Sequence, residues 1–404
     1  MQQGKFNILL DAMWGSSGKG KLSAWLADKF NVTNISSSNF PNAGHTFQYG
    51  DFRFVAKVIP TAMALKQAKG LGVQGWLSPA SGIPVELSTN AICPSLDTFR
   101  WKRLMCEWRD SGKPDIFIHS RASIVTPEHA RQEKDGPGST KHIASTMQGC
   151  SASMIEKILR KKECLLAGSR TIQEWAAPGD DVEEFMSSVR ILDGMHFRSS
   201  VQQLIQQGNT WLHEGSQGYA LSIDHGSSYP ACTSRNCTAQ KAMDDMTIPP
   251  SMVGDIYLNL RTHPIRVGNV VEDGVQLGYS GDFYPDCKEL TWEQVASESG
   301  MPTTEAAALT ERERTTVTKR VRRVCSFSWV GLEDAVASNG ATKLALNFVQ
   351  YLDWNDHQLR GGRDAFQKLS QKTRSFIDKI ETTANLPVVI IGTGADHEDV
   401  INLM

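Results

Sequence analysis

The sequence lacks any long hydrophobic run. No stretch of about 18 or more consecutive apolar residues occurs among its 404 residues, so we expect no membrane-spanning helix and no membrane partner. The N-terminal segment MQQGKFNILLDAMWG has too short an apolar run for a signal peptide and instead predicts a buried first strand. Disordered, collagen-like and coiled-coil chains are also excluded, because 40% of the residues are hydrophobic and 21% are charged.

Strong net charge and paired cysteine motifs are missing too. The 42 Lys and Arg against 44 Asp and Glu give a net charge of −2, which predicts no nucleic-acid partner but still allows local clusters that bind anionic substrates. No C-x-x-C pair occurs, so we expect free thiols in a reducing, cytoplasmic compartment rather than disulfides or a zinc site. The cysteines are Cys93, Cys106, Cys150, Cys164, Cys232, Cys237, Cys287 and Cys325.

Strand-like apolar runs alternate with longer amphipathic stretches. This pattern predicts an α/β protein with a large, mostly parallel central sheet flanked by helices. No repeat or linker divides the chain, so we expect a single domain over residues 1–404 with irregular loop or lid insertions at about 112–138 and 269–304. The predicted strands are 6–10, 210–212, 343–349 and 386–391, and the predicted helices are 22–30, 154–166, 182–207 and one beginning at Asp396.

The strongest local motif, WGSSGKGK at residues 14–21, follows the first predicted strand. Its glycines allow a tight turn that aims several backbone N–H groups at one point, and the following helix adds its positive N-terminal end. The standard P-loop has four residues between its glycines and Ser or Thr after the Lys, so this loop is a variant. It predicts phosphate binding, with Lys19 reaching β- or γ-oxygens; the alternative is a plain glycine-rich turn.

Two further regions have residues suited to ligand chemistry. The loop PNAGHT, residues 41–46, places His45 directly after a glycine, where an imidazole can act as a general acid or bind phosphate near neutral pH. The segments EGSQG (214–218), IDHG (223–226) and TSRNCT (233–238) follow a predicted strand end, where ligand loops of α/β sheets lie. A structural histidine and ordinary polar loops are the alternatives.

A basic run, ERERTTVTKRVRRV, covers residues 311–324. In an extended segment Arg320 and Arg322 would share one side, where two guanidinium groups can bind carboxylates in a bidentate manner. The alternative is that these residues form an ordinary solvated basic surface without a ligand. A nucleic-acid patch is disfavoured by the neutral net charge and by the lack of interleaved aromatic residues.

In this order, the four blocks resemble the adenylosuccinate synthetase family. That family has WGDEGKGK, NAGHT, EGAQG…DHG…TSNTT and TTGRxRR; this chain has WGSSGKGK, NAGHT, EGSQG…DHG…TSRNCT and VTKRVRR, with a further match at 392–394. The resemblance implies a carbon–nitrogen ligase of two steps. A nucleoside triphosphate phosphorylates O6 of a purine monophosphate, and the amine of L-aspartate then displaces that phosphate.

The resemblance also implies roles for individual residues. His45 would be the catalytic general acid, with Ser16 at the position of the family's catalytic Asp, and Ser16 and the Gly44 carbonyl would be Mg²⁺ ligands. The triphosphate set is Ser17, Gly18, Lys19, Gly20, Lys21, Gly44, His45, Thr46, Arg322, Asn347, Gln350, Gly392 and Gly394. The purine monophosphate set is Ser16, Asn42, Thr146, Gln148, Arg160, Gln217, Thr233, Val267 and Arg320, and the aspartate set is Val317, Thr318, Arg320 and Arg322.

Two of these matches need comment. Arg160 matches the family's Arg that reaches the substrate phosphate of the partner subunit, which implies a homodimer in which Arg160 acts in trans. Gln148 occupies the place of a phosphate-binding Arg or Lys.

The first departure from the family pattern is Ser16. The ordinary enzyme has Asp there, which takes the N1 proton of IMP; a Ser hydroxyl is no strong base unaided. Members from bacteriophages with diaminopurine DNA have Ser and act on dGMP, and a neutral hydroxyl both donates to and accepts from a guanine edge. We therefore predict dGMP as the substrate, and host cytoplasm as the location if the gene is viral. The alternatives are a synthetase acting on IMP and an inactive nucleotide-binding protein.

The second departure concerns the base of the triphosphate. The family reads GTP with an [N/T]-K-x-D strand end, whereas this chain has Asn347-Phe348-Val349-Gln350. The Gln amide offers a donor and an acceptor, which suit the N6 amine and N1 of adenine better than two guanine donors. We predict ATP or dATP as the energy donor, with Mg²⁺. Phe348 would flank the base or simply pack in a buried strand.

Overall fold

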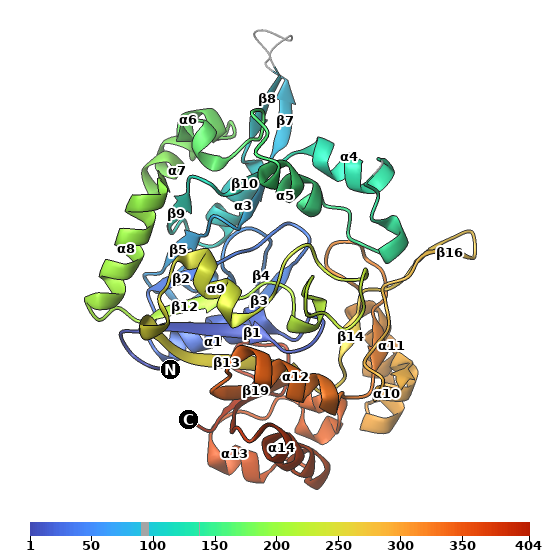
Figure 1. Cartoon of the computed structure of the whole chain (residues 1–404). Coiled ribbons are helices and arrows are strands. Elements are labelled where there is room, and N and C mark those ends of the chain that lie inside the picture. The colour runs from blue at the N-terminus through green and yellow to red at the C-terminus, as the bar shows by residue number, and fades with distance from the viewer. Residues whose placement is uncertain (90–96, 137) are drawn as a thin grey trace.

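The computed structural model describes residues 1–89, 97–136 and 138–404, and a ten-stranded sheet is its central element (Figure 1). Neighbouring strands are all parallel except the last pair, β20 and β21. The predicted α/β class with a large, mostly parallel sheet is therefore confirmed. In spatial order the strands are β11 (Val189–Leu192), β9 (Asp115–His119), β5 (Gln74–Leu77), β2 (Asn34–Ser37), β12 (Trp211–Glu214), β1 (Phe6–Asp11), β13 (Val253–Arg261), β19 (Lys343–Asn347), β20 (Val388–Gly392) and β21 (Val400–Asn402).

Strand β1 shows why the sheet forms. All six of its residues are buried, which is typical of a parallel strand covered on both faces. Successive side chains point to opposite faces, so Leu9 belongs to one hydrophobic cluster while Ile8 and Leu10 belong to another. The core therefore consists of two apolar layers, one on each face of the sheet.

Helices cover both faces of the sheet. Helix α1 packs into the Leu9 cluster through Leu22 and Leu26, whereas α8 packs into the other through Phe197 and Val201. The helices are α1 (Lys19–Lys29), α2 (Leu65–Lys69), α3 (Lys102–Asp110), α4 (Pro127–Asp135), α5 (Cys150–Ile158), α6 (Ile172–Trp175), α7 (Val182–Ser188), α8 (Gly194–Gln206), α9 (Ala239–Met246), α10 (Trp292–Ser299), α11 (Thr303–Arg312), α12 (Trp329–Asn339), α13 (Arg363–Gln367) and α14 (Gln371–Ala384).

Several small sheets lie around the central sheet. The hairpin of β3 and β4 lies above the centre of the large sheet, and that of β15 and β16 projects at one side (Figure 1). Their bounds are β3 (His45–Tyr49), β4 (Phe52–Ala56), β6 (Gly82–Pro84), β7 (Glu86–Thr89), β8 (Asp97–Arg100), β10 (Ser123–Val125), β14 (Ile265–Arg266), β15 (Val270–Glu272), β16 (Val275–Gly278), β17 (Glu289–Leu290) and β18 (Arg323–Cys325).

The four predicted strands are present as β1, β12, β19 and β20, with ends shifted by a few residues. Strand β19 stops at Asn347 because Phe348 adopts a left-handed φ of 66°. The prediction of a helix beginning at Asp396 is wrong. Backbone N–H of Asp396 instead bonds the Asp399 carboxylate at 3.0 Å, and this turn leads directly into β21.

Two predicted helices also need correction. Residues 182–207 form α7 and α8 separated by strand β11, which pairs in parallel with β9 at the edge of the sheet. Helix α5 starts earlier than predicted and ends at Ile158, because Arg160 has a left-handed φ of 54°. The helix predicted over 22–30 is present as α1 and starts earlier, at Lys19.

The segments expected to be irregular contain regular elements. Residues 112–138 include β9, whose Ile116 and Ile118 are fully buried, together with β10 and α4. Residues 269–304 include the β15–β16 hairpin, β17 and α10, and the start of α11. Helix α10 forms because Trp292 and Val295 pack into an apolar cluster that a loop could not fill.

Two results bear on the composition of the chain. In the ranges 1–89, 97–136 and 138–404 no helix is long and apolar enough to cross a membrane. Cys93 lies outside these ranges, and the other seven cysteines are free thiols, as predicted.

The central strands predict which positions control stability. Leu258 on β13 is fully buried, so Leu258→Ala should lower the free energy of unfolding by about 2–5 kcal/mol through lost contacts and a cavity. The urea midpoint, followed by circular dichroism, measures this loss. Val330→Ala on the exposed side of α12 is the matched control and should change little. Equal midpoints for the two variants would contradict the assigned core.

Candidate active site

A cavity of about 1480 Å³ lies where the central strands end. Its walls come from the loops after β1, β12, β13 and β19 and from the start of β3, which is the usual position of ligand sites in α/β sheets. Members of all four sequence motifs meet there. The predicted residues lining it are Ser16, Ser17, Gly18, Lys19, Gly20, Lys21, Asn42, Gly44, His45, Thr46, Thr146, Gln217, Thr233, Val267, Val317, Arg322, Asn347, Gln350 and Gly394.

Five predicted residues do not line this cavity: Gln148, Arg160, Thr318, Arg320 and Gly392. The Gln148 amide donates to the Thr146 carbonyl at 3.1 Å. Gly392 lies behind the wall, where a Cβ would come within 1.8 Å of the Asn347 side chain. Arg160 is exposed beyond the end of α5.

Arg320 and Arg322 have different contacts in the structure. The Arg320 guanidinium donates to the Ala144 and Ser145 carbonyls at 2.7 and 3.0 Å, so it holds the loop that carries Thr146. Arg322 instead lines the cavity. Val321, which lies between them in the chain, forms a β-bridge with Arg314, and the binding of carboxylates by this pair stays a prediction.

The glycine-rich loop wraps around the N-terminus of α1. Ser16 and Gly18 adopt left-handed φ values of 52° and 85°, and Gly18 is the residue that caps the helix. Gly20 lies so close to the β3 hairpin that a Cβ would meet the Thr46 carbonyl oxygen at 2.8 Å. The loop and His45 are thus held in direct contact.

Two buried lysines flank this loop. Lys19 donates to the Gln217 carbonyl at 2.6 Å and lies 3.5 Å from an Asp11 carboxylate oxygen. Lys21 donates to the Gly394 carbonyl at 2.7 Å, and burial lowers the pKa of its ammonium to about 8. Positive charge and helix N–H groups therefore converge on one end of the cavity, which suits a phosphate chain.

His45 is oriented by a buried carboxylate at the end of β12. Nδ1 of His45 bonds Oε1 of Glu214, whose two oxygens also accept from the Thr61 N–H at 2.9 Å and hydroxyl at 2.7 Å. Burial would raise the pKa of Glu214, but its interactions with His45 and Thr61 together hold that pKa below its usual value. With Nδ1 engaged, Nε2 is the imidazole atom left to act in the cavity.

A second buried carboxylate links the two ends of the cavity. Glu313 accepts from Arg261 Nη2 at 2.7 Å, from the Tyr351 hydroxyl at 2.9 Å and from Arg322 Nη1 at 3.3 Å. Burial would raise the pKa of Glu313, yet Arg261 and Arg322 keep it below the usual range. Nη1 of Arg261 donates to the Ser16 carbonyl at 2.9 Å, so one side chain fixes both Ser16 and Glu313.

The region expected to hold the base of the triphosphate lies beside Arg261. The centre of its guanidinium is 4.0 Å from the centre of the Phe348 ring, and Phe348 and Gln350 both line the cavity. Oε1 of Gln350 and Oδ1 of Asn42 are buried without a hydrogen-bond partner among the described residues. Buried polar atoms are normally paired, so these two acceptors suit ligand donors.

Sequence reasoning passed over the supporting residues Glu214, Arg261 and Glu313. Glu214 and Glu313 stand in the motifs EGSQG and ERTTVTKRVRR and were read only as parts of them. Arg261 could have been noticed as a charged residue at the end of an otherwise apolar strand.

The site holds few metal ligands of its own. The residues that the structure describes contain no group of three or more His, Cys, Asp or Glu side chains that could hold a metal ion. The expected Mg²⁺ ligands, the Ser16 hydroxyl and the Gly44 carbonyl, are neutral oxygens. Mg²⁺ prefers oxygen and often takes most of its ligands from substrate phosphates and water, so these donors fit a shared ion only.

Comparison with known proteins identifies similar chains. The adenylosuccinate synthetase family model matches residues 180–358. The N6-succino-2-amino-2′-deoxyadenylate synthase of Vibrio phage phiVC8 is 30% identical over 87% of this chain and 90% of its own length. The adenylosuccinate synthetase of Methanocaldococcus jannaschii is 28% identical over 98% of this chain and 96% of its own.

A solved structure is similar over nearly the whole chain. It is the succinoaminodeoxyadenylate synthetase of cyanophage S-2L, bound to dGMP and to dATP as an energy donor. It superposes with a TM-score of 0.73 at 26% identity, covering 98% of this chain and 95% of that one.

Replacing the carboxylate beneath His45 should cost stability in a pH-dependent way. Glu214→Gln should lower the free energy of unfolding at pH 7 by about 1–3 kcal/mol, because Thr61 and His45 lose a charged acceptor. The pKa of Glu214 lies below its usual value, so this contribution is complete above that value and is lost as the pH falls through and below it. Urea unfolding at several pH values should therefore show the two proteins converging in acid.

The exposed Glu333 on α12 provides the control, since Glu333→Gln removes a carboxylate that has no such role. It should leave stability unchanged at every pH. A Glu214→Gln deficit that stays constant into strong acid would show that the loss comes from packing and not from the ion pair.

Proposed function

The chain belongs to the adenylosuccinate synthetase family and is a carbon–nitrogen ligase, and we propose that it joins L-aspartate to C6 of dGMP. ATP would be cleaved to ADP and phosphate, and the product would be 2-amino-2′-deoxyadenylosuccinate, a precursor of diaminopurine DNA. The observation that carries this choice is Ser16, which is exposed in the cavity at the position where the family has Asp. Archaeal adenylosuccinate synthetases are nearly as similar as the phage enzymes, so IMP is the competing substrate.

The cavity offers a consistent place for each partner. Asn42, Thr146, Gln217 and Thr233 would surround the purine monophosphate, and Val317 and Arg322 would bind L-aspartate. The backbone carbonyl of Ser16 is fixed by Arg261, so its hydroxyl presents a neutral donor and acceptor at a defined place. A hydroxyl is also smaller than a carboxylate, so it leaves room beside the guanine edge, which carries an extra amine.

The two chemical steps follow from this placement. The γ-phosphoryl group of ATP would move to O6 of the purine while Nε2 of His45 stabilises the charge on that oxygen. The aspartate amine would then form the new bond to C6, and the C6–O6 bond would break with O6 leaving as part of inorganic phosphate. Glu214 would keep the imidazole in the orientation that both steps need. A Mg²⁺ ion held by Ser16, Gly44 and the triphosphate would neutralise phosphate charge.

Three features support ATP or dATP as the energy donor. Lys19, Lys21 and the glycine-rich loop supply cations and N–H groups for the triphosphate. The unpaired Oε1 of Gln350 would accept from the adenine N6 amine. The similar cyanophage enzyme was solved with dATP as the donor.

The surroundings of Arg160 support a homodimer. Ile158 and Leu159, directly before it, are large apolar side chains with 69% and 60% of their surface exposed. A second copy of the chain would cover them and bring the exposed Arg160 toward the neighbouring substrate phosphate. Arg160 would then act in trans.

Phosphate release with ATP, Mg²⁺ and L-aspartate, measured in parallel on dGMP and IMP, tests the proposed substrate. We expect turnover on dGMP at least about tenfold above that on IMP, with each product identified by mass. Ser16→Asp should lower activity on dGMP at least about tenfold, because the larger carboxylate takes up the room beside the purine edge that the extra amine needs. Turnover on IMP alone would show that the enzyme is an ordinary adenylosuccinate synthetase. No turnover on either substrate would indicate a nucleotide-binding protein without ligase activity.

The energy donor is tested at Gln350. Gln350→Asp replaces the amide with two acceptors, which suit the two donors of guanine. The ratio of kcat/KM for ATP over GTP should fall at least about tenfold, a change of about 1.4 kcal/mol. The same amide-to-acid change at the exposed Asn355 nearby is the control and should leave that ratio unchanged. An unchanged ratio in Gln350→Asp would show that another residue selects the base.

A further inference from the structure

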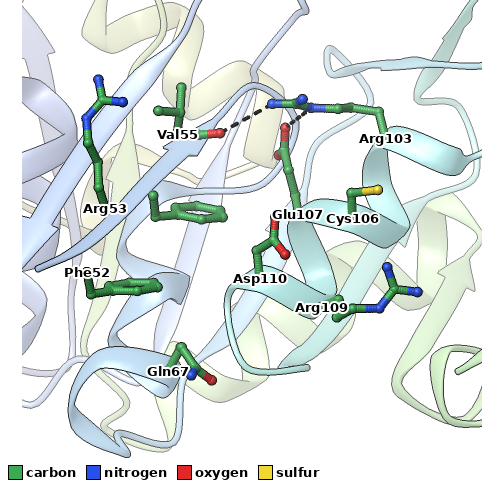
Figure 2. A pocket seen from close by; sticks show the side chains of 10 residues that line it. Phe52, Arg53, Val55, Gln67, Arg103, Cys106, Glu107, Arg109 and Asp110 are labelled. Atoms are coloured by element: carbon green, nitrogen blue, oxygen red, sulfur yellow. Dashed lines mark hydrogen bonds and ion pairs between the residues drawn. The ribbon is translucent and has the colours of Figure 1, made fainter.

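Four basic residues gather at one rim of the cavity, apart from the glycine-rich loop. Arg53 and Lys57 lie four positions apart on the same face of the β4 strand and its extension, with Val55 between them. Arg103 from α3 donates to the Val55 carbonyl at 3.4 Å, and Lys319 approaches from the loop after α11. Figure 2 shows the guanidinium groups of Arg53 and Arg103 on either side of Val55.

The basic rim formed by Arg53, Lys57, Arg103 and Lys319 has fewer nearby carboxylates than positive charges. Among the described residues, Arg53, Lys57 and Lys319 form no ion pair within 4 Å. The nearby carboxylate, Glu107, is already saturated: it accepts from Arg103 Nε at 2.7 Å and from the backbone N–H groups of residues 57, 58 and 59 at 3.0, 2.9 and 3.2 Å. Three cations therefore face the cavity without a partner.

The ionisation of Lys57 reflects the same imbalance. Burial lowers the pKa of its ammonium, the positive charges of Arg103 and Lys319 lower it further, and Glu107 opposes them only in part. Like charges held together in a half-buried place repel, and a bound anion would relieve that repulsion.

The position of the rim indicates what kind of anion would arrive. Lys57 directly follows Ala56, and Ala56 pairs with His45 across the antiparallel hairpin, where paired Cα atoms lie about 4.5–5.5 Å apart. The rim is therefore on the same hairpin as the imidazole but opens toward solvent and toward a second cavity of about 520 Å³. Guanidinium groups bind phosphoryl oxygens in a bidentate manner, and ammonium groups add point charge.

We propose that Arg53, Lys57, Arg103 and Lys319 form a second anion site that binds a phosphoryl dianion, separate from the glycine-rich loop. The ligand is inorganic phosphate, which the proposed ligase reaction would release beside it, or the phosphate of a nucleoside monophosphate. Binding to this site does not require the ligase reaction, so the two proposals can fail independently.

Calorimetric titration with inorganic phosphate tests the site. The full-length protein is first saturated with a non-hydrolysable ATP analogue, which occupies the glycine-rich loop. If that analogue does not bind, the Lys19→Gln variant without nucleotide is used to weaken phosphate binding at the loop. We expect one phosphate per chain, weakened at least fivefold by Lys57→Gln and by Arg53→Gln. Arg53 is exposed, so its variant should keep the fold, which circular dichroism checks.

Lys102→Gln is the matched control. Lys102 neighbours Arg103 on α3, but its side chain is 63% exposed, pairs with Glu86 and lines neither cavity. It should leave phosphate binding unchanged. Phosphate binding that is insensitive to both Lys57→Gln and Arg53→Gln, or that disappears once the loop is filled, would overturn the proposal.

A parallel titration with AMP distinguishes the two sources of the anion. Binding of phosphate alone assigns the site to the free ion. Binding of both, lost in the same two variants, assigns it to any small phosphoryl group, including that of a nucleotide.

Discussion

The arrangement of the cavity depends on one buried guanidinium, that of Arg261. It donates to the Ser16 carbonyl, pairs with Glu313 and lies against the Phe348 ring, so it touches the substrate end and the nucleotide end together. A buried charge is costly unless it is paired, which fixes Arg261 to Glu313 and through it Arg322 and Tyr351. The loops on either side are therefore connected through one ion-paired side chain.

This connection explains how Ser can stand where the family has Asp. Ser16 is held in its left-handed conformation through its backbone carbonyl, while its side chain takes no part in that contact. Lys19 and Asp11 stabilise the rest of the loop, and Lys19 also reaches the Gln217 carbonyl. The position can thus change chemistry without changing loop geometry, and substrate choice can diverge on one scaffold.

The sequence predicted what is local and missed what depends on distant partners. Strands such as β1 and β19 are recognisable because they are continuous buried runs, and the phosphate loop because glycines impose its turn. Strand β11 was assigned to a helix because four residues, VRIL, carry little pattern and only β9 makes them a strand. Glu313 and Arg261 lie 52 positions apart in the chain, so no spacing rule could join them. The alternation of Arg320 and Arg322 could not indicate that Arg320 bonds to the Ala144 carbonyl, 176 positions away in the chain.

The two departures from the family pattern agree with each other under the proposed substrate and energy donor. A ligase that accepts a guanine monophosphate meets other guanine nucleotides in the same pool. If its donor pocket also recognised guanine, one nucleotide could compete for both ends of the cavity. Selectivity is a difference between affinities, so the donor pocket gains most by rejecting the base that the other end accepts. Ser16 and Gln350 are the residues that would divide this task, and Arg261 contacts both the Ser16 carbonyl and the ring of Phe348, two residues before Gln350.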